Sequence, residues 1–291
     1  MQASKARAGR RTLETVTQAL ARIRQAARLM KKERFTALLH HVNVDLLRAS
    51  FFDLKKDAAP GVDGQTWEDY AATLQPRLED LHARVQRGAY RPSPSRRVYI
   101  PKPDGRQRPL AVAALEDKIV QRAVATVLNA IYEEDFLGFS YGFRPGRGAH
   151  DALDALVVGI ERKKVSWILD ADIRSFFDTI NQEWLVRFLE HRIGDRRIIR
   201  LIRKWLKAGV LEDGVVTASD MGQGTKEIWQ GSVISPLLAN IYMFYVFDLW
   251  ADRWRRREAR DSVMNLRRDH RALCRRFHRW VRARGRGPAL P

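Results

Sequence analysis

The chain is organised around the stretch Ser166-Trp-Ile-Leu-Asp-Ala-Asp-Ile-Arg-Ser-Phe-Phe-Asp178. Its apolar start predicts a short buried strand, and two acids, Asp170 and Asp172, follow directly. In a strand, residues two apart point to the same face, so both carboxylates lie opposite Ala171 and Ile173. Carboxylates at the end of a buried strand are costly unless they are paired, hydrated or bound to a cation. Two interpretations stay open: a solvated strand end or a cation site.

The composition indicates a polyanionic partner. The 291 residues can bury a substantial core and hold one large domain or two small ones. Lys and Arg number 53 against 34 Asp and Glu, a formal charge of +19, for which nucleic acid is the default partner. The excess is uneven, because residues 253–291 hold 14 Arg, no Lys and 3 acids, a net +11 that leaves +8 for residues 1–252.

Cysteine use and hydropathy indicate the compartment. The single cysteine, Cys274, excludes a disulfide framework and is typical of a reducing environment. The N-terminus is basic without the apolar core of a signal peptide, and no apolar run approaches a membrane span. We therefore expect a soluble intracellular protein, located in the cytoplasm and not bound to a membrane.

The hydrophobic pattern predicts helices separated by two hairpins. Residues 1–10 are small and basic, which favours a disordered arm, and apolar residues then recur at helical spacing. Thr66 can cap the helix that follows the turn at 59–64. The expected helices cover residues 13–30, 45–56, 67–87, 119–131, a segment from about 150, 182–191, 196–208 and 235–250, and the expected hairpins cover 96–110 and 210–218.

A basic turn and a glycine-containing helix start are further site candidates. Lys102 and Arg108 flank the bend Pro103-Asp-Gly105, and they either form an ordinary solvated hairpin tip or face one anionic ligand such as a triphosphate. Gln230-Gly-Ser-Val-Ile-Ser-Pro-Leu-Leu238 opens a helix with a Ser-Pro start. Within it, Gly231 would let a backbone or a base approach closely.

Three further residues have two interpretations each. Phe177 follows Asp172 by five residues and is either part of the core or part of a site. Asp178 either caps the next turn or takes part in chemistry. Arg144, in Gly142-Phe-Arg-Pro145, could hold a phosphate or a carboxylate.

In this order, the motifs closely resemble those of the group II intron-encoded reverse transcriptases, which also act as intron maturases. The resemblance covers residues from about 33 to 250. Its pieces are Pro60-Gly-Val-Asp-Gly64, Tyr99-Ile-Pro-Lys-Pro-Asp-Gly105 with Arg108-Pro-Leu110, Asp117-Lys-Ile-Val-Gln121, Ser140-Tyr-Gly-Phe-Arg-Pro-Gly-Arg147, Ala171-Asp-Ile-Arg-Ser-Phe-Phe-Asp178 and Gln230-Gly through Ile234-Ser-Pro-Leu-Leu-Ala-Asn-Ile-Tyr242.

The resemblance implies an α+β fold of the right-hand polymerase type. Fingers and a partial palm, an antiparallel sheet packed on helices, are expected, and the thumb and the maturase domain are expected to be absent. The expected segments are a basic arm and helix (1–32), a helical extension (33–95), fingers (96–165), a partial palm (166–252) and an aberrant Arg-rich tail (253–291).

The resemblance also implies roles in RNA-templated DNA synthesis. Asp172, with the Ile173 carbonyl, resembles the first Mg²⁺-binding catalytic carboxylate. Phe177 resembles the steric gate that selects dNTPs. The remaining matches are Lys102 and Arg108, which resemble the triphosphate-holding residues, and Gln230 and Gly231, which resemble the lining of the nucleotide pocket. The implied partners are template or intron RNA, a DNA primer and dNTPs.

Two departures bear on activity. The family usually has Gly-Thr-Pro-Gln-Gly ahead of the helix, whereas Gly224-Thr-Lys-Glu-Ile-Trp229 intervenes here and lengthens the loop. The second acidic motif, Tyr-Ala-Asp-Asp, should follow Trp254-Arg-Arg-Arg-Glu-Ala259 by about ten residues and is absent; only Asp261 and Asp269 occur there. Without that motif the metal pair loses essential carboxylates, so we predict little or no polymerase activity.

The tail itself offers an explanation. Leu273-Cys-Arg-Arg-Phe277 can be encoded by CTA TGC CGA CGA TTT, which one base later reads Tyr-Ala-Asp-Asp. The same shift over residues 268–284 allows a normal family sequence, so we hypothesise a frameshift between Arg260 and Arg267. The alternative is a genuine basic extension that binds nucleic acid.

Two non-enzymatic alternatives remain. The chain could be a splicing cofactor that binds intron RNA through its N-terminal helices and fingers. It could also be an unstable remnant, because a half-built palm would leave apolar surface uncovered on Ile241, Phe244, Val246 and Phe247.

Overall fold

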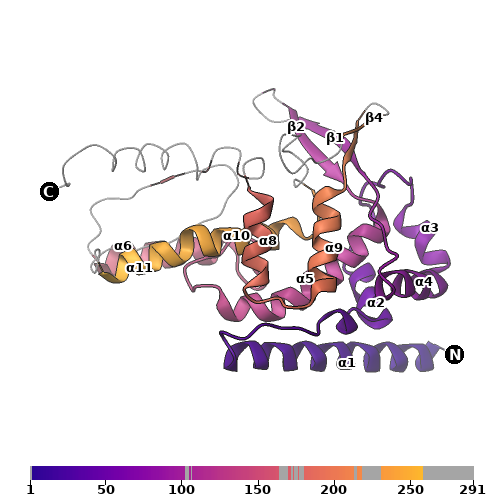
Figure 1. Ribbon diagram of the computed structural model, residues 1–291, viewed down its shortest axis with the longest axis horizontal. Helices are drawn as coiled ribbons and strands as arrows, with labels where there is room; N and C mark the ends of the chain where they lie inside the picture. Colours follow the sequence, from indigo (N-terminus) through magenta and orange to yellow (C-terminus); the bar gives the residue numbers. More distant parts are fainter. Residues whose placement is uncertain are drawn as a thin grey trace. The chain divides into compact units, whose positions relative to one another are not determined.

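The computed structural model describes residues 2–101, 105, 107–163, 170–171, 173, 176, 180–212, 215–217 and 231–257 (Figure 1). The described residues form a mixed α+β fold, as predicted. The chain divides into two compact units: the first comprises Met1–Asp135 and Asn181–Leu238, and the second comprises Phe136–Ile180 and Ala239–Pro291. The five segments expected from the sequence stay a prediction.

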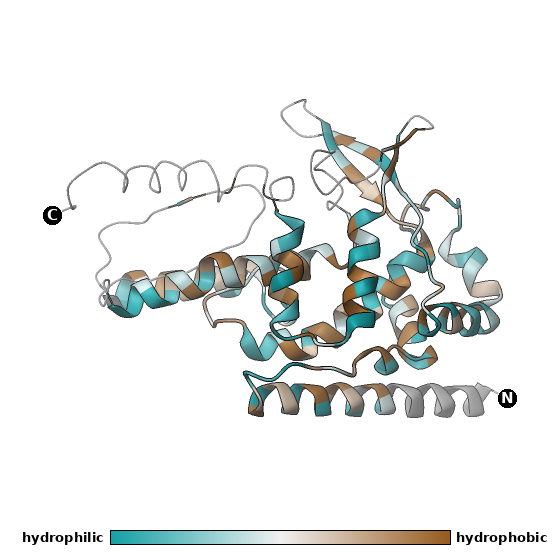
Figure 2. Ribbon diagram, in the orientation of Figure 1, coloured by the Kyte–Doolittle hydropathy of each residue, from teal (hydrophilic) through white to brown (hydrophobic). Residues whose placement is uncertain are grey.

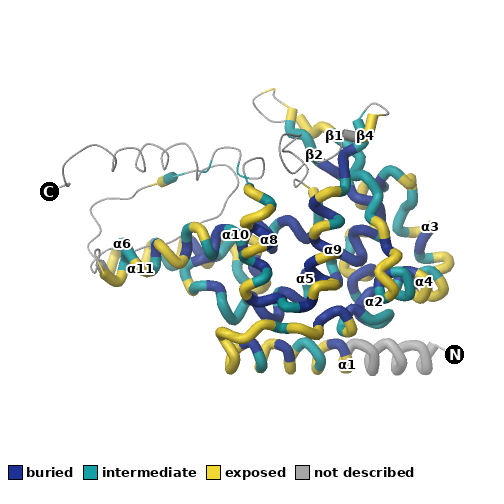
Figure 3. The backbone as a smooth tube through the Cα atoms, viewed as in Figure 1, coloured by how far each residue is buried: buried dark blue, intermediate teal, exposed yellow. Residues whose placement is uncertain are grey.

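Helix α5 is the centre of the first unit. It runs over Leu115–Asp135, and its apolar side chains are buried along nearly its whole length, as its dark blue tube shows in Figure 3. Helices α1 (Gln2–Leu29) and α2 (Val44–Phe52) pack against it. The prediction of a disordered arm over residues 1–10 is wrong, because α1 begins at Gln2. The Ala, Arg and Lys residues there are strong helix formers.

The single helix expected over residues 67–87 is two helices. Helix α3 (Trp67–Ala72) begins with the predicted Thr66 cap, which forms a reciprocal capping box with Asp69. Helix α4 (Leu74–Gln86) follows after Thr73, whose backbone leaves the helical region. The break has a local cause, because Pro76 has no N–H and its ring collides with the carbonyl four residues earlier.

The sheet of the first unit has the strand order β2-β1-β3-β4. The predicted hairpin over 96–110 pairs β1 (Ser95–Pro101) with β2 (Gln107–Val112), and the one over 210–218 pairs β3 (Val210–Glu212) with β4 (Val215–Thr217), each antiparallel. The two hairpins join through β1 and β3, which run parallel. Segments more than a hundred residues apart in sequence thus share one sheet.

Helices α8 (Gln182–Glu190) and α9 (Arg196–Lys207) confirm the predicted pair, and the turn between them ties the unit together. There, the buried Arg192 donates from Nε to Asp135 Oδ2 at 2.7 Å, from Nη1 to Met30 O at 2.8 Å and from Nη2 to Ala27 O at 3.3 Å. One guanidinium therefore joins the end of α5 to the last carbonyls of α1.

Asp195 makes the second connection in the same turn. It caps α9 through the Arg197 N–H at 2.9 Å and accepts the N–H groups of Leu38 and Leu39 at 2.8 and 2.9 Å. Burial alone would raise the pKa of Asp195, but these N–H groups and the Arg197 side chain lower it to about 2. The carboxylate is therefore charged whenever the unit is folded near neutral pH.

The second unit contains α6 (Ala149–Lys163) and, from Ala239 on, a helix that begins in the first unit as α10 (Ser235–Met243), passes through the π-turn η2 (Phe244–Asp248) and ends as α11 (Leu249–Arg257). The expectation of uncovered apolar surface is wrong for Ile241 and Phe244, which are buried; the Phe244 ring packs edge-on to Phe136 at 5.7 Å. Val246 is exposed as expected. None of the described helices is both long and apolar enough to cross a membrane.

Candidate functional site

The candidate site is built on three polar residues at the start of α5. Asp117, Lys118 and Gln121 are all buried, among apolar neighbours such as Ile119 and Val120. Buried polar groups are costly unless they are hydrogen-bonded. Each of the three reaches a different loop, and those loops carry the motifs singled out in the sequence.

Asp117 holds the segment that leads into β1. Its Oδ1 accepts the Tyr90 hydroxyl and its Oδ2 accepts the Ser93 N–H at 3.0 Å, while Trp205 Nε1 donates to the Tyr90 oxygen at 3.0 Å. Burial raises the pKa of Asp117 to about 6, against the lowering effect of the two hydrogen bonds. The network links α5, β1 and α9.

Lys118 holds the turn at Pro60-Gly-Val-Asp-Gly64. Its Nζ donates to Ala59 O at 2.8 Å, and Arg96 on β1 donates to Pro60 O at 2.8 Å. At Gly61 a Cβ would lie only 2.5 Å from Ala114 Cα. The glycine is required here because the turn lies directly against the backbone that enters α5.

Gln121 holds the start of the Gln230-Gly motif. Its Oε1 accepts the Ser232 hydroxyl at 2.8 Å and the Val233 N–H at 3.1 Å. Gly231 has φ +114°, and a Cβ there would lie 2.4 Å from Ala111 O on β2. The close backbone approach predicted for this glycine is confirmed, and the neighbour is the protein's own strand.

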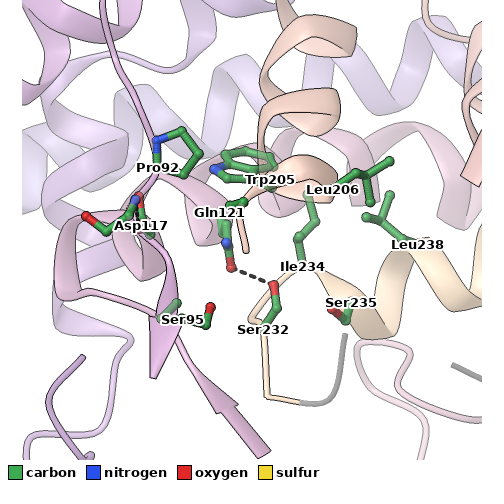
Figure 4. Close-up of a pocket in the computed structure, with 13 residues that line it drawn as sticks. Pro92, Ser95, Asp117, Gln121, Trp205, Leu206, Ser232, Ile234, Ser235 and Leu238 are labelled. Carbon is green, nitrogen blue, oxygen red and sulfur yellow. Dashed lines mark hydrogen bonds between the residues drawn. The ribbon is translucent and has the colours of Figure 1, made fainter. Parts of the chain in front are cut away.

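These contacts surround a small cavity of about 30 Å³ that is lined by both polar and apolar residues (Figure 4). Figure 4 shows Asp117 and Gln121 from α5 facing it, with Ser95, Ser232 and Ser235 on the other sides. A space of this size holds about one water molecule, so it is too small for a nucleotide. We interpret the cavity as part of the support of a site rather than as the site itself.

Three of the predicted site residues lie in the described part of the chain. Arg108 is half-buried on β2, opposite Ile100, so the basic hairpin exists as predicted. Gly231 lies against β2, and Ile173 is half-buried in the second unit. The other predicted residues lie outside the described residues: Lys102, Asp172, Phe177 and Gln230.

Arg144 contacts carbonyl groups of its own loop, and its expected role of holding a phosphate or a carboxylate stays a prediction. It is buried, and its Nη1 donates to the carbonyls of Leu137 and Ser140, both at 2.8 Å, while its guanidinium lies 5.3 Å from the centre of the Phe136 ring. It therefore organises its own loop in the second unit. Its neighbour Asn240 donates to Gly142 O at 2.9 Å and ties that loop to α10.

The described residues alone do not make a metal site. Among them, no three His, Cys, Asp or Glu side chains are grouped to hold an ion. Of the central stretch at 166–178, the structure describes the exposed Asp170 and also Ile173, whose carbonyl is a predicted ligand. Asp172 lies outside the described residues. As a donor set, a carboxylate with a neighbouring carbonyl supplies the hard oxygen ligands that Mg²⁺ prefers.

Sequence reasoning missed the roles of Asp117, Lys118 and Gln121, although it quoted them as a motif. A signal was present, because Asp117 and Gln121, at positions i and i+4, share a helix face with the apolar Val124 and Leu128, and polar residues on such a face indicate buried hydrogen bonds. Their partners could not be predicted from the sequence, since they lie between 24 and 112 residues away.

Residues 100–268 match the family described as reverse transcriptase (RNA-dependent DNA polymerase), which is more than half of the chain. The chain therefore belongs to the reverse transcriptase family. Its relatives include intron-encoded proteins, which confirms the resemblance to the group II intron-encoded reverse transcriptases and maturases.

Three relatives define the similarity. Protein YkfC of Escherichia coli is 40% identical over 187 residues, 63% of this chain and 48% of that protein. The group II intron-encoded protein LtrA of Lactococcus lactis is 32% identical over 213 residues, 72% of this chain and 34% of that protein. The putative COX1/OXI3 intron 1 protein of Saccharomyces cerevisiae is 31% identical over 211 residues, 72% of this chain and 24% of that protein. The chain thus spans less than half the length of these relatives.

Proposed function

We propose that the chain is the nucleotide-binding part of a group II intron reverse transcriptase, built to extend a primer 3′-hydroxyl with dNTPs on an RNA template. The main observation behind the proposal is that three side chains of α5 form hydrogen bonds with three different motif loops. Lys118 fixes the turn at residues 59–64, Asp117 fixes the entry to the basic hairpin and Gln121 fixes the Gln230-Gly loop. A nucleotide pocket needs such fixed walls, because transition-state stabilisation depends on geometry set before the reaction.

In this proposal the hairpin binds the triphosphate. Lys102 and Arg108 supply positive charge, and the half-buried Arg108 is held on a paired strand. Gly231 brings the Gln230 loop against that same strand at Ala111. Phe177 is proposed to exclude a ribose 2′-hydroxyl and so to select dNTPs.

Mg²⁺ is the proposed cofactor, with Asp172 and the Ile173 carbonyl as its ligands. When bound, the ion would stabilise the charge that develops on the transferred phosphoryl group. The protein's own part is to present the carboxylate and to orient the triphosphate through Lys102 and Arg108. In architectural terms we propose fingers and a partial palm of a right-hand polymerase, in a cytoplasmic protein.

We further propose that this particular chain synthesises little or no DNA. The expected second acidic motif is missing from residues 258–291, which lie outside the described residues. The family match ends at residue 268, close to the proposed frameshift between Arg260 and Arg267. The gene sequence tests this: codons for residues 273–276 that cannot be read one base later as Tyr-Ala-Asp-Asp would rule out the frameshift.

Primer extension tests the enzymatic proposal. The purified chain is given an RNA template, a DNA primer, dNTPs and Mg²⁺, with Asp172→Ala as the matched control. Synthesis at the level of that control is the expected outcome, and robust extension by the unaltered chain would contradict the loss of activity. A crosslinkable dNTP separates binding from synthesis, because retained labelling that Arg108→Ala abolishes would support the pocket.

A second function is favoured by the moderately basic balance of residues 1–252, which carry +8 without the tail. The chain would then act as a splicing cofactor that binds intron RNA without synthesis. This alternative requires salt-dependent RNA binding that survives Asp172→Ala. Loss of RNA binding in that variant would count against it.

A further inference from the structure

Helix α9 divides its residues sharply between two faces. Its apolar face is buried in the first unit, with Ile198 and Ile202 fully covered and Trp205 only 7% exposed. The opposite face carries exposed basic side chains at positions 196, 200, 203 and 207, a spacing of four, three and four residues that keeps them on one side. In Figure 2 the two classes alternate along α9 as brown and teal.

Most of this charge is not neutralised within the described part of the chain. Arg203 pairs with Glu190 at 3.3 Å, but both side chains are exposed, so the pair is weak. Arg196, Arg200 and Lys207 have no carboxylate within ion-pair distance among the described residues. Arg196 and Lys207 are the ends of a 12-residue helix, so the stripe is about 16 Å long at a rise of about 1.5 Å per residue.

A neighbouring loop adds to the same positive surface. Lys204 donates to the carbonyls of Gly88 and Tyr90, which places the exposed Arg87 and Arg91 beside α9. Burial, and then the charges of Arg91 and Arg200, lower the pKa of Lys204. The positive charges are therefore close enough to repel one another.

Stability does not explain this arrangement. The first turn of α9 places Arg196 and Arg197 at the positive end of the helix dipole, and the carboxylate of the Asp195 cap pairs with Arg197 at 3.3 Å and leaves Arg196 without a carboxylate partner in the described structure. Cations at that end destabilise a helix, and like charges on one face add to the cost. A bound polyanion would relieve both effects.

The chemistry of the face selects the kind of polyanion. A helix that binds a membrane surface inserts an apolar face between the lipids, and the apolar face of α9 is already buried in the protein. A row of cations without adjacent apolar contacts suits the phosphate backbone of a nucleic acid, which is bound through charge and without reading the bases.

We propose that the basic face of α9, formed by Arg196, Arg200, Arg203 and Lys207 with Arg87 and Arg91 beside them, binds the phosphate backbone of structured RNA. Only the choice of RNA over DNA rests on the proposed function. The face itself requires no synthesis and includes none of the residues assigned to the nucleotide pocket, so it acts as an anchoring surface for the RNA.

The test compares two triple variants of the full chain. The first is Arg196→Gln, Arg200→Gln and Lys207→Gln, and the matched control is Lys31→Gln, Lys32→Gln and Lys55→Gln, which removes the same charge from exposed positions elsewhere. Binding to a fluorescent, blunt-ended RNA duplex that offers no primer 3′ end is measured by anisotropy over a salt series. Thermal melting checks that both variants are folded.

The expected result is a loss of about 2 to 3 in the slope of log affinity against log salt for the α9 variant, since each phosphate contact contributes about 0.7–0.9. The control should change much less. An unchanged slope, or an equal loss in both variants, overturns the proposal, as does an α9 variant that loses binding to anionic lipid vesicles but keeps RNA binding. Asp172→Ala should leave the slope unchanged, so failure of the polymerase proposal and failure of this one give different results.

Discussion

Helices α5 and α9 lie in the same unit and differ in where their polar residues lie and in what those residues contact. Helix α5 buries Asp117, Lys118 and Gln121 and gives each a partner from another segment. Helix α9 keeps its basic residues outside and leaves most of them without a carboxylate partner in the described structure. The first arrangement fixes loops relative to one another, and the second leaves charge for an external ligand. The comparison separates groups that hold the fold from groups that are free to bind.

The largest expected effect comes from breaking the buried ion pair between Arg192 and Asp135 at the end of α5. Arg192→Ala leaves Asp135 buried without its partner and removes the donors to the carbonyls that end α1. We expect a loss of about 3–5 kcal/mol in the free energy of unfolding, measured by urea denaturation. Arg203→Ala, which breaks the exposed pair with Glu190, is the control and should cost about 0–1 kcal/mol. Equal costs would show that burial does not distinguish the two pairs.

Gly231 gives the next largest effect. In Gly231→Ala the new Cβ would lie 2.4 Å from Ala111 O, and the residue would keep a φ of +114°. We expect about 2–4 kcal/mol of destabilisation from strain and displaced backbone, measured by the same denaturation. Gly64→Ala is the control: it has φ +65° with open space around it, so only the smaller cost of about 1–2 kcal/mol for a left-handed residue applies.

Tyr90→Phe tests the Asp117 network through pH. The variant loses the hydroxyl that donates to Asp117 and accepts from Trp205, at an expected cost of about 1–3 kcal/mol. Because the folded pKa of Asp117 is raised to about 6, its contribution to stability is complete below the unfolded pKa of about 4 and is lost as pH rises through 6. Without the hydroxyl that pKa rises further, so the gap between variant and parent should widen above pH 6. A gap independent of pH would mean that Asp117 does not titrate there.

The smallest expected effect concerns Asp195, whose contribution to stability changes with pH in the opposite direction to that of Asp117. The folded pKa of Asp195 is lowered to about 2, so its contribution is present above the unfolded pKa of about 4 and is lost as pH falls towards 2. Urea denaturation between these pH values should show a decline that Asp195→Asn reduces. A decline of equal size in both proteins would assign it to other carboxylates.

Much of the fold could be predicted from the sequence because the signals are local. Apolar residues at helical spacing gave α5, α8 and α9, and the turn residues at Pro103-Asp-Gly105 gave the hairpin that carries Arg108. The break at Thr73 was missed because the helical pattern is strong on both sides of it, and only Pro76 indicates the break.

The site was predictable in part. A close approach at Gly231 was predicted from its place in the motif, and its φ of +114° agrees with the choice of glycine. Its actual neighbour on β2 depends on a contact 120 residues away in sequence. The parallel pairing of β1 with β3 could not be predicted either, since nothing in the sequence of one strand indicates the other as its partner. Local chemistry thus identifies which residues are unusual, and tertiary structure decides what they touch.

The hold of Gln121 on Ser232 and Val233 has a consequence for how this protein can vary. These bonds attach the chain at Ser232 and Val233 to α5, so α10 starts from a position that α5 determines. The junction just before Gly231 is accordingly a place where evolution, or an engineer, can lengthen the polypeptide without disturbing α10.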